Sequence, residues 1–377
     1  MDGTTRAPKS TSAFDGLLAA LADIRDQYAQ SAERHRDELE VVEAFLYVSH
    51  LLSEANDLLL EGDPERPRFS SMVSPARKYL GDNPDATYYQ ALIRGDRSYR
   101  VTGRRDRQCY ISFTVHGPDP AGGINGPVLA DINDDGLDIA ANGSFELVLS
   151  PEKHEGNWIE LAPTARYLIM RNYFLLEHSA QLDPAVGVRI AIEPLDEPGP
   201  APTLDDPTLA ARLDDVTAFV RATTLGMRVF GGPATVPFVS DVPNTVGTPW
   251  SFRNAGVDAA GAVDIYYSSG TFDLAPGEAM VMEGTLPASR FTNVVLWNVH
   301  MQTLEYRSRR CSLNAAQIAT EADGTYRIII SDTDPGLPNW LDTGGHRRGT
   351  VFWRFLLPET QPETPRCRVV RVSELRS

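Results

Sequence analysis

Gly143-Ser-Phe-Glu-Leu-Val-Leu-Ser150 returns later in the chain as Gly324-Thr-Tyr-Arg-Ile-Ile-Ile-Ser331. An Asn-Trp pair follows each copy, at Asn157-Trp158 and at Asn339-Trp340. The spacing between the copies is slightly longer at the Asn-Trp pair than at the first glycine. A repeat whose spacing drifts in this way is typical of a duplicated unit that has acquired small loop insertions. We therefore predict two related structural units.

Each unit is predicted to be a β-sandwich. Apolar and polar residues alternate over residues 99–103, 110–115 and 144–149, and turn residues separate these stretches. A second series of such stretches begins near Val263 and runs to about Val369. Short strands between turn signals are typical of antiparallel sandwiches and jelly rolls.

Residues 12–61 have the period of helices, because apolar residues such as Phe14, Leu17 and Leu21 recur three and four positions apart. We predict two helices there that form a hairpin, with the charged stretch 31–37 as their junction or as a solvated face. The fold class is therefore α+β, an N-terminal helical hairpin with two duplicated antiparallel β-sandwich or jelly-roll units. The predicted order is a disordered tail over residues 1–11, a helical region over 12–87, the first sandwich over 88–195, a linker, a helix (207–226) and an extended arm (227–262) over 196–262, and the second sandwich over 263–377.

The composition is that of a soluble globular protein, with 42% hydrophobic and 23% charged residues. The formal net charge of −16 argues against a nucleic-acid partner, because binding to phosphate backbones requires clustered positive charge. Three widely spaced cysteines give neither a disulfide framework nor a zinc motif. The sequence has no nucleophile elbow, Walker A or zinc-protease motif, no apolar leader and no apolar run that could span a membrane. We expect a cytoplasmic protein without membrane contact and without a cofactor.

The second unit carries a candidate catalytic group. Alternation over Trp297-Asn-Val-His300 predicts a strand with Asn298 and His300 on one face. Asp342 and His346 lie in a loop further along the chain, and together these residues could move protons to and from a bound anion. The first unit has no matching histidine. The alternative is that His300 is an interior residue with satisfied hydrogen bonds and that His346 is a solvated loop residue.

Arg171 and Arg354 follow the Asn-Trp pair of their own unit, and each lies inside an otherwise apolar strand. A buried guanidinium group needs anionic or carbonyl partners. Each arginine could therefore pair with an internal carboxylate such as Glu146 or Asp342. Alternatively, it could bind the carboxylate, sulfate or phosphate group of a ligand.

The two Asn-Trp pairs also have two interpretations. Trp158 and Trp340, with Asn339 beside the second, could stack on a sugar or another flat ligand. Each indole could instead close the end of a sandwich, with its N–H group bonded to a backbone carbonyl. Because both units retain the pair, we favour the structural interpretation.

A further stretch, Asp131-Ile-Asn-Asp-Asp-Gly136, resembles the beginning of a calcium loop. Asp131, Asn133 and Asp135 would supply oxygen ligands at positions 1, 3 and 5. The twelfth position is Asn142 instead of the glutamate that the motif requires. We therefore interpret the stretch as a turn-rich loop and expect no metal.

The second unit resembles a bacterial family of domains of unknown function, number 1214. The residues that carry the resemblance are Leu296-Trp-Asn-Val-His300, Arg310-Cys-Ser-Leu-Asn-Ala-Ala-Gln317 and Asp334-Pro-Gly-Leu-Pro-Asn-Trp-Leu-Asp342. Gly81-Asp-Asn-Pro-Asp-Ala86 and the Asn157-Trp158 region resemble the longer single-chain members, which are related to proteins with the domain numbered 1254. The resemblance implies duplicated sandwich or jelly-roll modules. It implies no activity.

Two functions remain open. In the first, the protein recognises an anionic or polyhydroxylated small molecule in a sandwich cleft, and a catalytic form would be a metal-independent hydrolase or lyase with His300 or His346 as the base. In the second, it is a non-catalytic ligand-binding module or a homo-oligomeric assembly module, joined through residues 12–61 and 227–262. Convergence of His300, Asp342, His346 and Arg354 in one pocket would favour the enzyme, and their separation would favour the second function.

Overall fold

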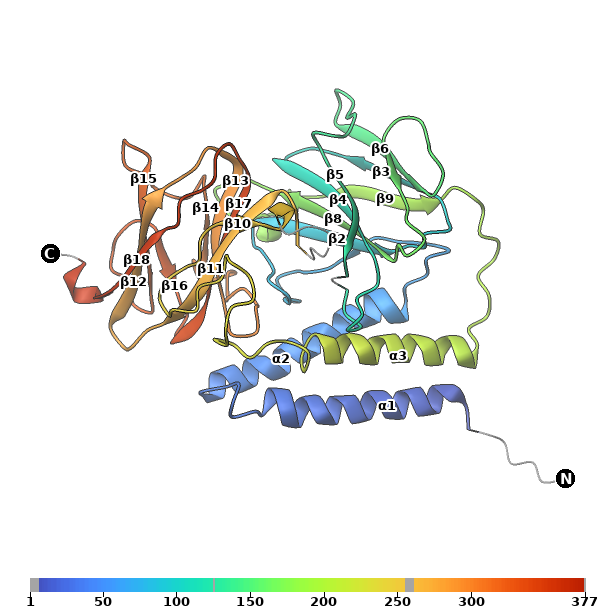
Figure 1. Ribbon diagram of the computed structural model, residues 1–377, viewed down its shortest axis with the longest axis horizontal. Helices are drawn as coiled ribbons and strands as arrows, with labels where there is room; N and C mark the ends of the chain where they lie inside the picture. The colour runs from blue at the N-terminus through green and yellow to red at the C-terminus, as the bar shows by residue number, and fades with distance from the viewer. Residues whose placement is uncertain (1–6, 125, 255–260, 376–377) are drawn as a thin grey trace.

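Two β-sandwiches with the same strand order make up most of the chain, which confirms the predicted duplication (Figure 1). The structure is a computed structural model, and it describes residues 7–124, 126–254 and 261–375. Each sandwich combines a five-stranded sheet with a four-stranded sheet. The fold class is α+β, and Figure 1 shows the three long helices beneath the two sandwiches.

The first sandwich begins before residue 88, because its first strand is already formed at residues 70–71. Apolar side chains of both sheets, such as Phe113 and Leu147, fill the space between them. The five-stranded sheet has the order β1 (Ser70–Ser71), β2 (Ala86–Leu92), β8 (Tyr167–Tyr173), β4 (Tyr110–His116) and β5 (Val128–Asn133). The four-stranded sheet has the order β7 (Trp158–Glu160), β6 (Ser144–Ser150), β3 (Tyr99–Arg104) and β9 (Arg189–Pro194).

The second sandwich repeats this arrangement strand by strand. Its core lies between the two sheets and includes Trp353 and Ile330. The five-stranded sheet has the order β10 (Trp250–Ser251), β11 (Ile265–Asp273), β17 (Arg348–Pro358), β13 (Ser289–Trp297) and β14 (Ser312–Asn314). The four-stranded sheet has the order β16 (Trp340–Asp342), β15 (Thr325–Ser331), β12 (Glu278–Thr285) and β18 (Arg366–Arg371).

The register of the strands explains a glycine that the two units share. Gly103 of β3 lies opposite Phe145 of β6, and Gly284 of β12 lies opposite Tyr326 of β15. A Cβ atom at Gly103 would come within 2.4 Å of the Phe145 ring, and one at Gly284 would come within 2.7 Å of the Tyr326 hydroxyl. Each glycine therefore leaves room for an aromatic ring of the neighbouring strand.

The two predicted N-terminal helices are α1 (Lys9–Ile24) and α2 (Glu38–Ala55), and each continues into one π-helical turn, at Arg25–Ala29 and Asn56–Leu60. Helix α1 therefore begins inside the predicted tail, whose first six residues lie outside the described part. The third helix, α3 (Asp206–Ala222), begins where the Asp205 side chain accepts a hydrogen bond from the backbone N–H of Thr208. Apolar residues of α1 and α3 pack against each other, and α2 also contacts α3. The three helices lie together on one side of the sandwiches (Figure 1).

The arm after α3 packs on its own chain. The backbone N–H of Ser269 in β11 donates to the carbonyl of Phe238, and the N–H of Ser240 donates back to the carbonyl of Ser269. The arm then enters the sheet as β10, and its residues 255–260 lie outside the described part. The hypothesis of self-assembly assumes that the arm belongs to neither sandwich. The described part of the arm instead packs on the second sandwich, which removes the reason for that hypothesis.

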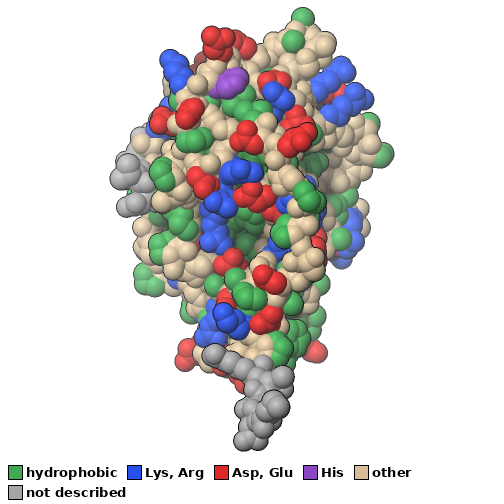
Figure 2. Space-filling view, turned by 90° about the vertical axis from the view of Figure 1, so that its right-hand side faces the viewer, with side chains coloured by type: hydrophobic (Ala, Val, Ile, Leu, Met, Phe, Trp, Pro, Cys, Tyr) green, Lys and Arg blue, Asp and Glu red, His purple; other side chains and the backbone are tan. Residues whose placement is uncertain are grey.

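The surface carries charges of both signs. On the face shown in Figure 2, basic and acidic side chains are interspersed. In the described part of the chain, no helix has both the length and the apolar character that a bilayer crossing requires. Three single 3-10 turns complete the secondary structure of this part, at Ala180–Leu182, Phe252–Asn254 and Val372–Glu374.

Candidate functional site

The two sandwiches meet through their five-stranded sheets, and their contacts are reciprocal. Asp85, just before β2, accepts a hydrogen bond of 2.9 Å from the side-chain amide of Asn314 in β14. Asp264, just before β11, accepts one of 2.6 Å from the side-chain amide of Asn133 in β5. The two contacts occupy equivalent positions in the repeat, as they would in a dimer with two-fold symmetry. An apolar cluster with residues of both sandwiches packs around them.

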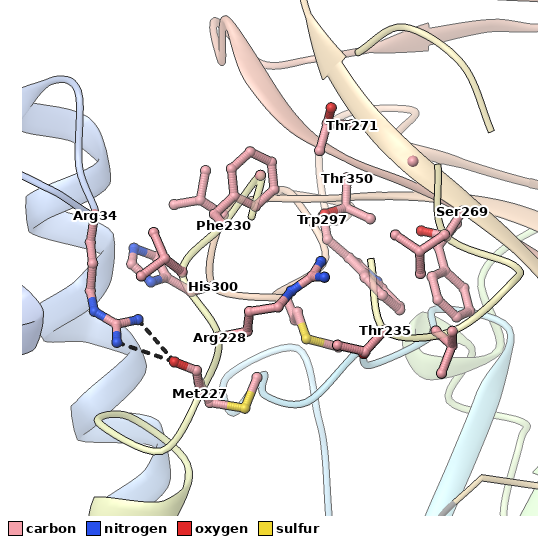
Figure 3. Close-up of a pocket in the computed structure, with 18 of the residues that line it drawn as sticks. Arg34, Met227, Arg228, Phe230, Thr235, Ser269, Thr271, Trp297, His300 and Thr350 are labelled. Atoms are coloured by element: carbon pink, nitrogen blue, oxygen red, sulfur yellow. Dashed lines mark hydrogen bonds between the residues drawn. The ribbon is translucent and has the colours of Figure 1, made fainter. Parts of the chain in front are cut away.

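Two adjoining cavities lie at and beside this interface. The first, which we call the interdomain cavity, has a volume of about 310 Å³ and is lined by both Arg171 and Arg354. The second, which we call the arm cavity, has a volume of about 360 Å³ and lies under arm residues 227–239 (Figure 3). The residues that line both cavities are Phe238, Trp297, Met301 and Phe352.

Arg354 of β17 is buried, with 5% of its surface exposed. Its Nη2 atom donates a hydrogen bond of 2.8 Å to the backbone carbonyl of Gly81, which belongs to the first half of the chain. Its Nη1 atom has no hydrogen-bond partner within the described residues. The guanidinium group lies over the rings of Trp297 and Phe352, at 5.2 and 4.8 Å from the ring centres, where cation–π attraction offsets part of its desolvation.

Arg171 of β8 occupies the equivalent position in the first sandwich but has a different partner. Its Nη1 atom donates a hydrogen bond of 2.5 Å to the hydroxyl of Thr114, which in turn donates to Asp131. The position equivalent to Thr114 in the second unit is Val295, which offers no hydroxyl group. The second unit therefore has no hydroxyl group at the position that supplies the partner of Arg171.

The expected ion pairs of these arginines are not formed. Glu146 pairs with Arg100, and Asp342 pairs with Arg309. Over residues 7–124, 126–254 and 261–375, no carboxylate forms an ion pair with Arg171 or Arg354. The prediction of an internal pair with Glu146 or Asp342 is therefore wrong. The arginines instead take a hydroxyl group and a backbone carbonyl as partners.

Three carboxylates interact electrostatically with these arginines without forming an ion pair with them, Asp82 and Asp85 with Arg354 and Asp131 with Arg171. Asp82 lines the interdomain cavity and accepts a hydrogen bond of 2.7 Å from the backbone N–H of Thr303. Burial raises the pKa of Asp82 to about 6, although the nearby Lys78 ammonium group counteracts this shift. Burial also raises the pKa of Asp131, which the Thr114 hydroxyl counteracts. The positive charge of the arginines is thus only partly offset by the protein.

His300 lines the arm cavity, but both of its ring nitrogens are engaged. Nδ1 lies 2.8 Å from the hydroxyl of Tyr28, and Nε2 lies 2.9 Å from the backbone carbonyl of Glu40. Burial lowers the pKa of His300 to about 4. The imidazole is therefore neutral near pH 7, with Nε2 as the donor to the carbonyl and Nδ1 as the acceptor from Tyr28. This arrangement is that of an interior histidine that links the second sandwich to the helices.

Asp342 and His346 are not part of either cavity lining. Asp342 forms an ion pair of 2.8 Å with Arg309 and accepts a hydrogen bond from the backbone N–H of Gly344. His346 is largely buried and lies 2.8 Å from a carboxylate oxygen of Glu43 in α2. The structure thus does not bring His300, Asp342, His346 and Arg354 together in one pocket.

The alternation expected over residues 297–300 is wrong, because β13 ends at Trp297 and the chain then turns. Trp297, Val299 and His300 all line the arm cavity as a result. The Asn298 side chain bonds within this turn, where its oxygen accepts from the backbone N–H groups of His300 and Gln302. Asn298 therefore shapes the turn that presents His300.

The Asn-Trp pairs make the same internal contacts in both units. The Asn339 amide donates to the carbonyls of Ala319 and Arg327, and the Asn157 amide donates to their equivalents, Asp138 and Glu146. The Trp340 indole donates to the Ser331 hydroxyl at 3.0 Å, and the Trp158 indole donates to the Ser150 hydroxyl at 3.1 Å. These contacts give both pairs a structural role at the parallel strand pairs β6–β7 and β15–β16.

The stretch that resembles a calcium loop is partly a strand. Asp131 and Asn133 belong to β5, where they bond to Thr114 and Asp264. Asp135 pairs with Arg290 of the second sandwich at 2.8 Å. These oxygens are committed to protein partners, and no cluster of metal-ligating side chains is found in the described part of the chain.

Several lining residues were missed from the sequence. Arg34 and His35 come from the charged stretch between α1 and α2, and both line the arm cavity. Arg34 donates to the backbone carbonyl of Met227 (Figure 3), while Nδ1 of His35 has no partner among the residues described. Tyr88 and Tyr267, which are the cross-strand neighbours of Arg171 and Arg354, line the interdomain cavity. The charged stretch 31–37 was the available signal for Arg34 and His35. The alignment of the two repeat copies was the available signal for Tyr88 and Tyr267.

The comparisons with known proteins agree with this architecture. Residues 81–174 and 273–360 match the family described as "Protein of unknown function (DUF1214)", so each half of the repeat carries one match. The chain is similar to the crystal structure of an uncharacterised protein from Burkholderia cenocepacia, with 30% identity, a TM-score of 0.84, and coverage of 97% of this chain and 99% of that one. The VPA0106 protein from Vibrio parahaemolyticus shares the fold, with 13% identity, a TM-score of 0.50, and coverage of 87% and 98%. The search of curated proteins gave no match. The chain therefore belongs to the DUF1214 family.

Proposed function

We propose that this protein binds a small anionic molecule in the interdomain cavity, with Arg354 as the contact to the anionic group. The observation that carries the proposal is the buried guanidinium of Arg354, which lines the cavity and whose Nη1 atom has no partner in the described part of the chain. A buried charge without a counter-charge costs free energy, and a ligand anion would supply that counter-charge.

The walls of the cavity suit an anion with an apolar body. Trp297 and Phe352 flank the guanidinium group, and Tyr267 and Phe238 continue the aromatic wall. Ligand sites commonly combine such apolar walls with a few fixed polar groups, and their volumes begin at about 300 Å³. A charge-assisted hydrogen bond from Nη1 would then fix the orientation of the ligand.

Binding has more support than turnover. A general base needs a ring nitrogen or a carboxylate that can reach the substrate. His300 uses both ring nitrogens for Tyr28 and Glu40, and His346 bonds to Glu43 outside both cavities. Because neither histidine that was predicted as the base is free, we place the hydrolase or lyase hypothesis second to a ligand-binding function.

Thermal denaturation with matched probes tests the proposal. Benzoate, benzenesulfonate and phenyl phosphate should raise the melting temperature, whereas benzamide, a neutral analogue of benzoate, should not. Arg354→Gln should abolish the shift, and Arg327→Gln, which removes an exposed arginine of β15, should retain it. The proposal is wrong if none of the three anions stabilises the wild-type protein, or if Arg354→Gln, shown to be folded by circular dichroism, responds as the wild type does.

A further inference from the structure

We propose that the ligand carries two anionic groups joined by a flat apolar segment, one group bound by Arg354 and the other by Arg171. This inference rests on the proposed function and specifies its ligand class. The two arginines are equivalent positions of the repeat, and both line the interdomain cavity from opposite sandwiches.

The electrostatics of the cavity favour a doubly charged ligand. Both guanidinium groups lack an ion pair in the described part of the chain, and two cations that line one cavity repel each other. A single carboxylate would compensate one of the two charges, whereas a dianion would compensate both. Asp82 and Asp131 offset part of this positive charge, but neither forms an ion pair with Arg354 or Arg171 among the described residues.

Two tyrosines of the interdomain cavity are cross-strand neighbours of the arginines, Tyr88 of Arg171 and Tyr267 of Arg354. Burial raises the pKa of Tyr267, and both Arg354 and Arg171 counteract that shift. The same holds for Tyr88, where burial again is the largest cause of the raised pKa and the two arginines again oppose it. These two tyrosines and both arginines line the same interdomain cavity, so a molecule that fills the cavity lies beside all four side chains.

The aromatic walls of the interdomain cavity favour a flat connecting segment in the ligand. Tyr88, Tyr173 and Tyr267 line the cavity together with Trp297 and Phe352. Aromatic rings prefer offset-stacked or edge-to-face neighbours, which an aromatic or conjugated segment would provide. An extended aliphatic dicarboxylate would satisfy the charges but not these ring faces.

Isothermal titration calorimetry with matched pairs tests the inference. The probes are benzoate and the benzene-1,2-, 1,3- and 1,4-dicarboxylates, together with pentanedioate as a flexible aliphatic dianion. At least one aromatic dicarboxylate should bind at least about tenfold more tightly than benzoate, a difference of about 1.4 kcal/mol in binding free energy. The same dicarboxylate should also bind more tightly than pentanedioate. Arg171→Gln should reduce the ratio of dicarboxylate affinity to benzoate affinity to about one, and Arg171→Lys, which keeps the charge but loses the planar fork, should reduce it partially.

The outcomes separate this inference from the proposed function. If benzoate binds through Arg354 but no dicarboxylate binds more tightly, the two-group ligand is wrong and the anion site remains. If Arg171→Gln weakens benzoate as much as the dicarboxylates, one anionic group bridges both arginines, and the inference is again wrong. If pentanedioate equals the best aromatic dicarboxylate, the flat segment is wrong. Each of these outcomes is read from ratios of ligand affinity, measured on the wild type or on variants shown to be folded. Arg327→Gln is the control variant.

Discussion

Asn133 and Asn314 lie in opposite sandwiches, and each donates a side-chain hydrogen bond to a carboxylate of the other sandwich. The acceptors, Asp264 and Asp85, also occupy equivalent positions, immediately before β11 and β2. A contact that recurs in both directions is the property of an isologous interface. The duplicated chain therefore packs as a two-fold dimer would, and the two strand arginines face one shared cavity as a consequence.

The Asp85 contact makes a prediction about stability. Asn314 bonds to both Asp85 and the backbone carbonyl of Leu176, so Asn314→Ala leaves buried polar groups short of a partner. We expect the free energy of unfolding to fall by about 1–3 kcal/mol, the usual cost of such a loss. Chemical denaturation measures the difference, with Gln30→Ala, an exposed amide, as the control. Equal stability of wild type and Asn314→Ala would contradict a stabilising role for this contact.

The same variant should show a pH dependence. Burial raises the pKa of Asp85 to about 6, and the amides of Asn293 and Asn314 counteract this shift because they stabilise the ionised form. Loss of Asn314 therefore costs more at pH 8, where Asp85 is ionised, than at pH 5, where it is mostly protonated. Denaturation of Asn314→Ala and wild type at both pH values measures the two differences. A cost that is larger at pH 5 would mean that the amides do not support the carboxylate.

The pair of His346 and Glu43 predicts the opposite pH dependence, a stability cost that grows as the pH falls. Burial lowers the pKa of His346, but the hydrogen bond and charge of Glu43 outweigh it, so that the pKa is raised overall. A histidine with a raised pKa contributes stability that is fully present below its unfolded pKa of about 6.5 and is lost as the pH rises through the folded pKa. Glu43→Gln should therefore destabilise most near pH 5.5 and least near pH 8.5, as denaturation curves at the two pH values would measure. Glu33→Gln, which removes an exposed carboxylate, should show no such trend.

The Asn-Trp pairs should contribute to stability and not to ligand binding. Asn339→Ala removes donors to Ala319 and Arg327, and Asn157→Ala removes the equivalent donors in the first unit. Both variants should lose about 1–3 kcal/mol of unfolding free energy, because backbone groups at the strand pair lose their partner. Calorimetric affinity for benzoate should stay at the wild-type value. A large loss of affinity in a folded Asn339→Ala variant would instead support the ligand interpretation of this pair.

The sequence predicted the duplication and the sandwiches because a repeat and a period of two are local patterns. Arg171 and Arg354 stood out for the same reason, as charged residues inside apolar strands. How the two units face each other could not be predicted, since reciprocal contacts such as Asp85 with Asn314 join residues 229 positions apart. The same limit applies to His300, whose partner Tyr28 lies 272 positions away. The alternation over residues 297–300 failed because it was extended beyond the end of β13.

His300 gives the last prediction, which separates a structural role from a catalytic one. Burial lowers its pKa to about 4, so the unfolded state binds more protons between pH 4 and 6.5, and the stability of the protein should fall as the pH decreases through this window. The contribution of His300 is at most about 3 kcal/mol, at about 1.36 kcal/mol for each pKa unit.

His300→Gln should therefore be less stable than wild type at pH 7.5, because the Tyr28 hydroxyl and the Glu40 carbonyl lose the imidazole between them, and the difference should shrink toward pH 4.5. Denaturation curves across this range measure it, and His154→Gln, at an exposed position, should run parallel to wild type. Affinity for benzoate should change little at pH 7.5, because His300 lines the arm cavity and not the interdomain cavity that holds Arg354. A constant difference in stability across the pH range, together with a loss of ligand binding, would return His300 to the ligand site.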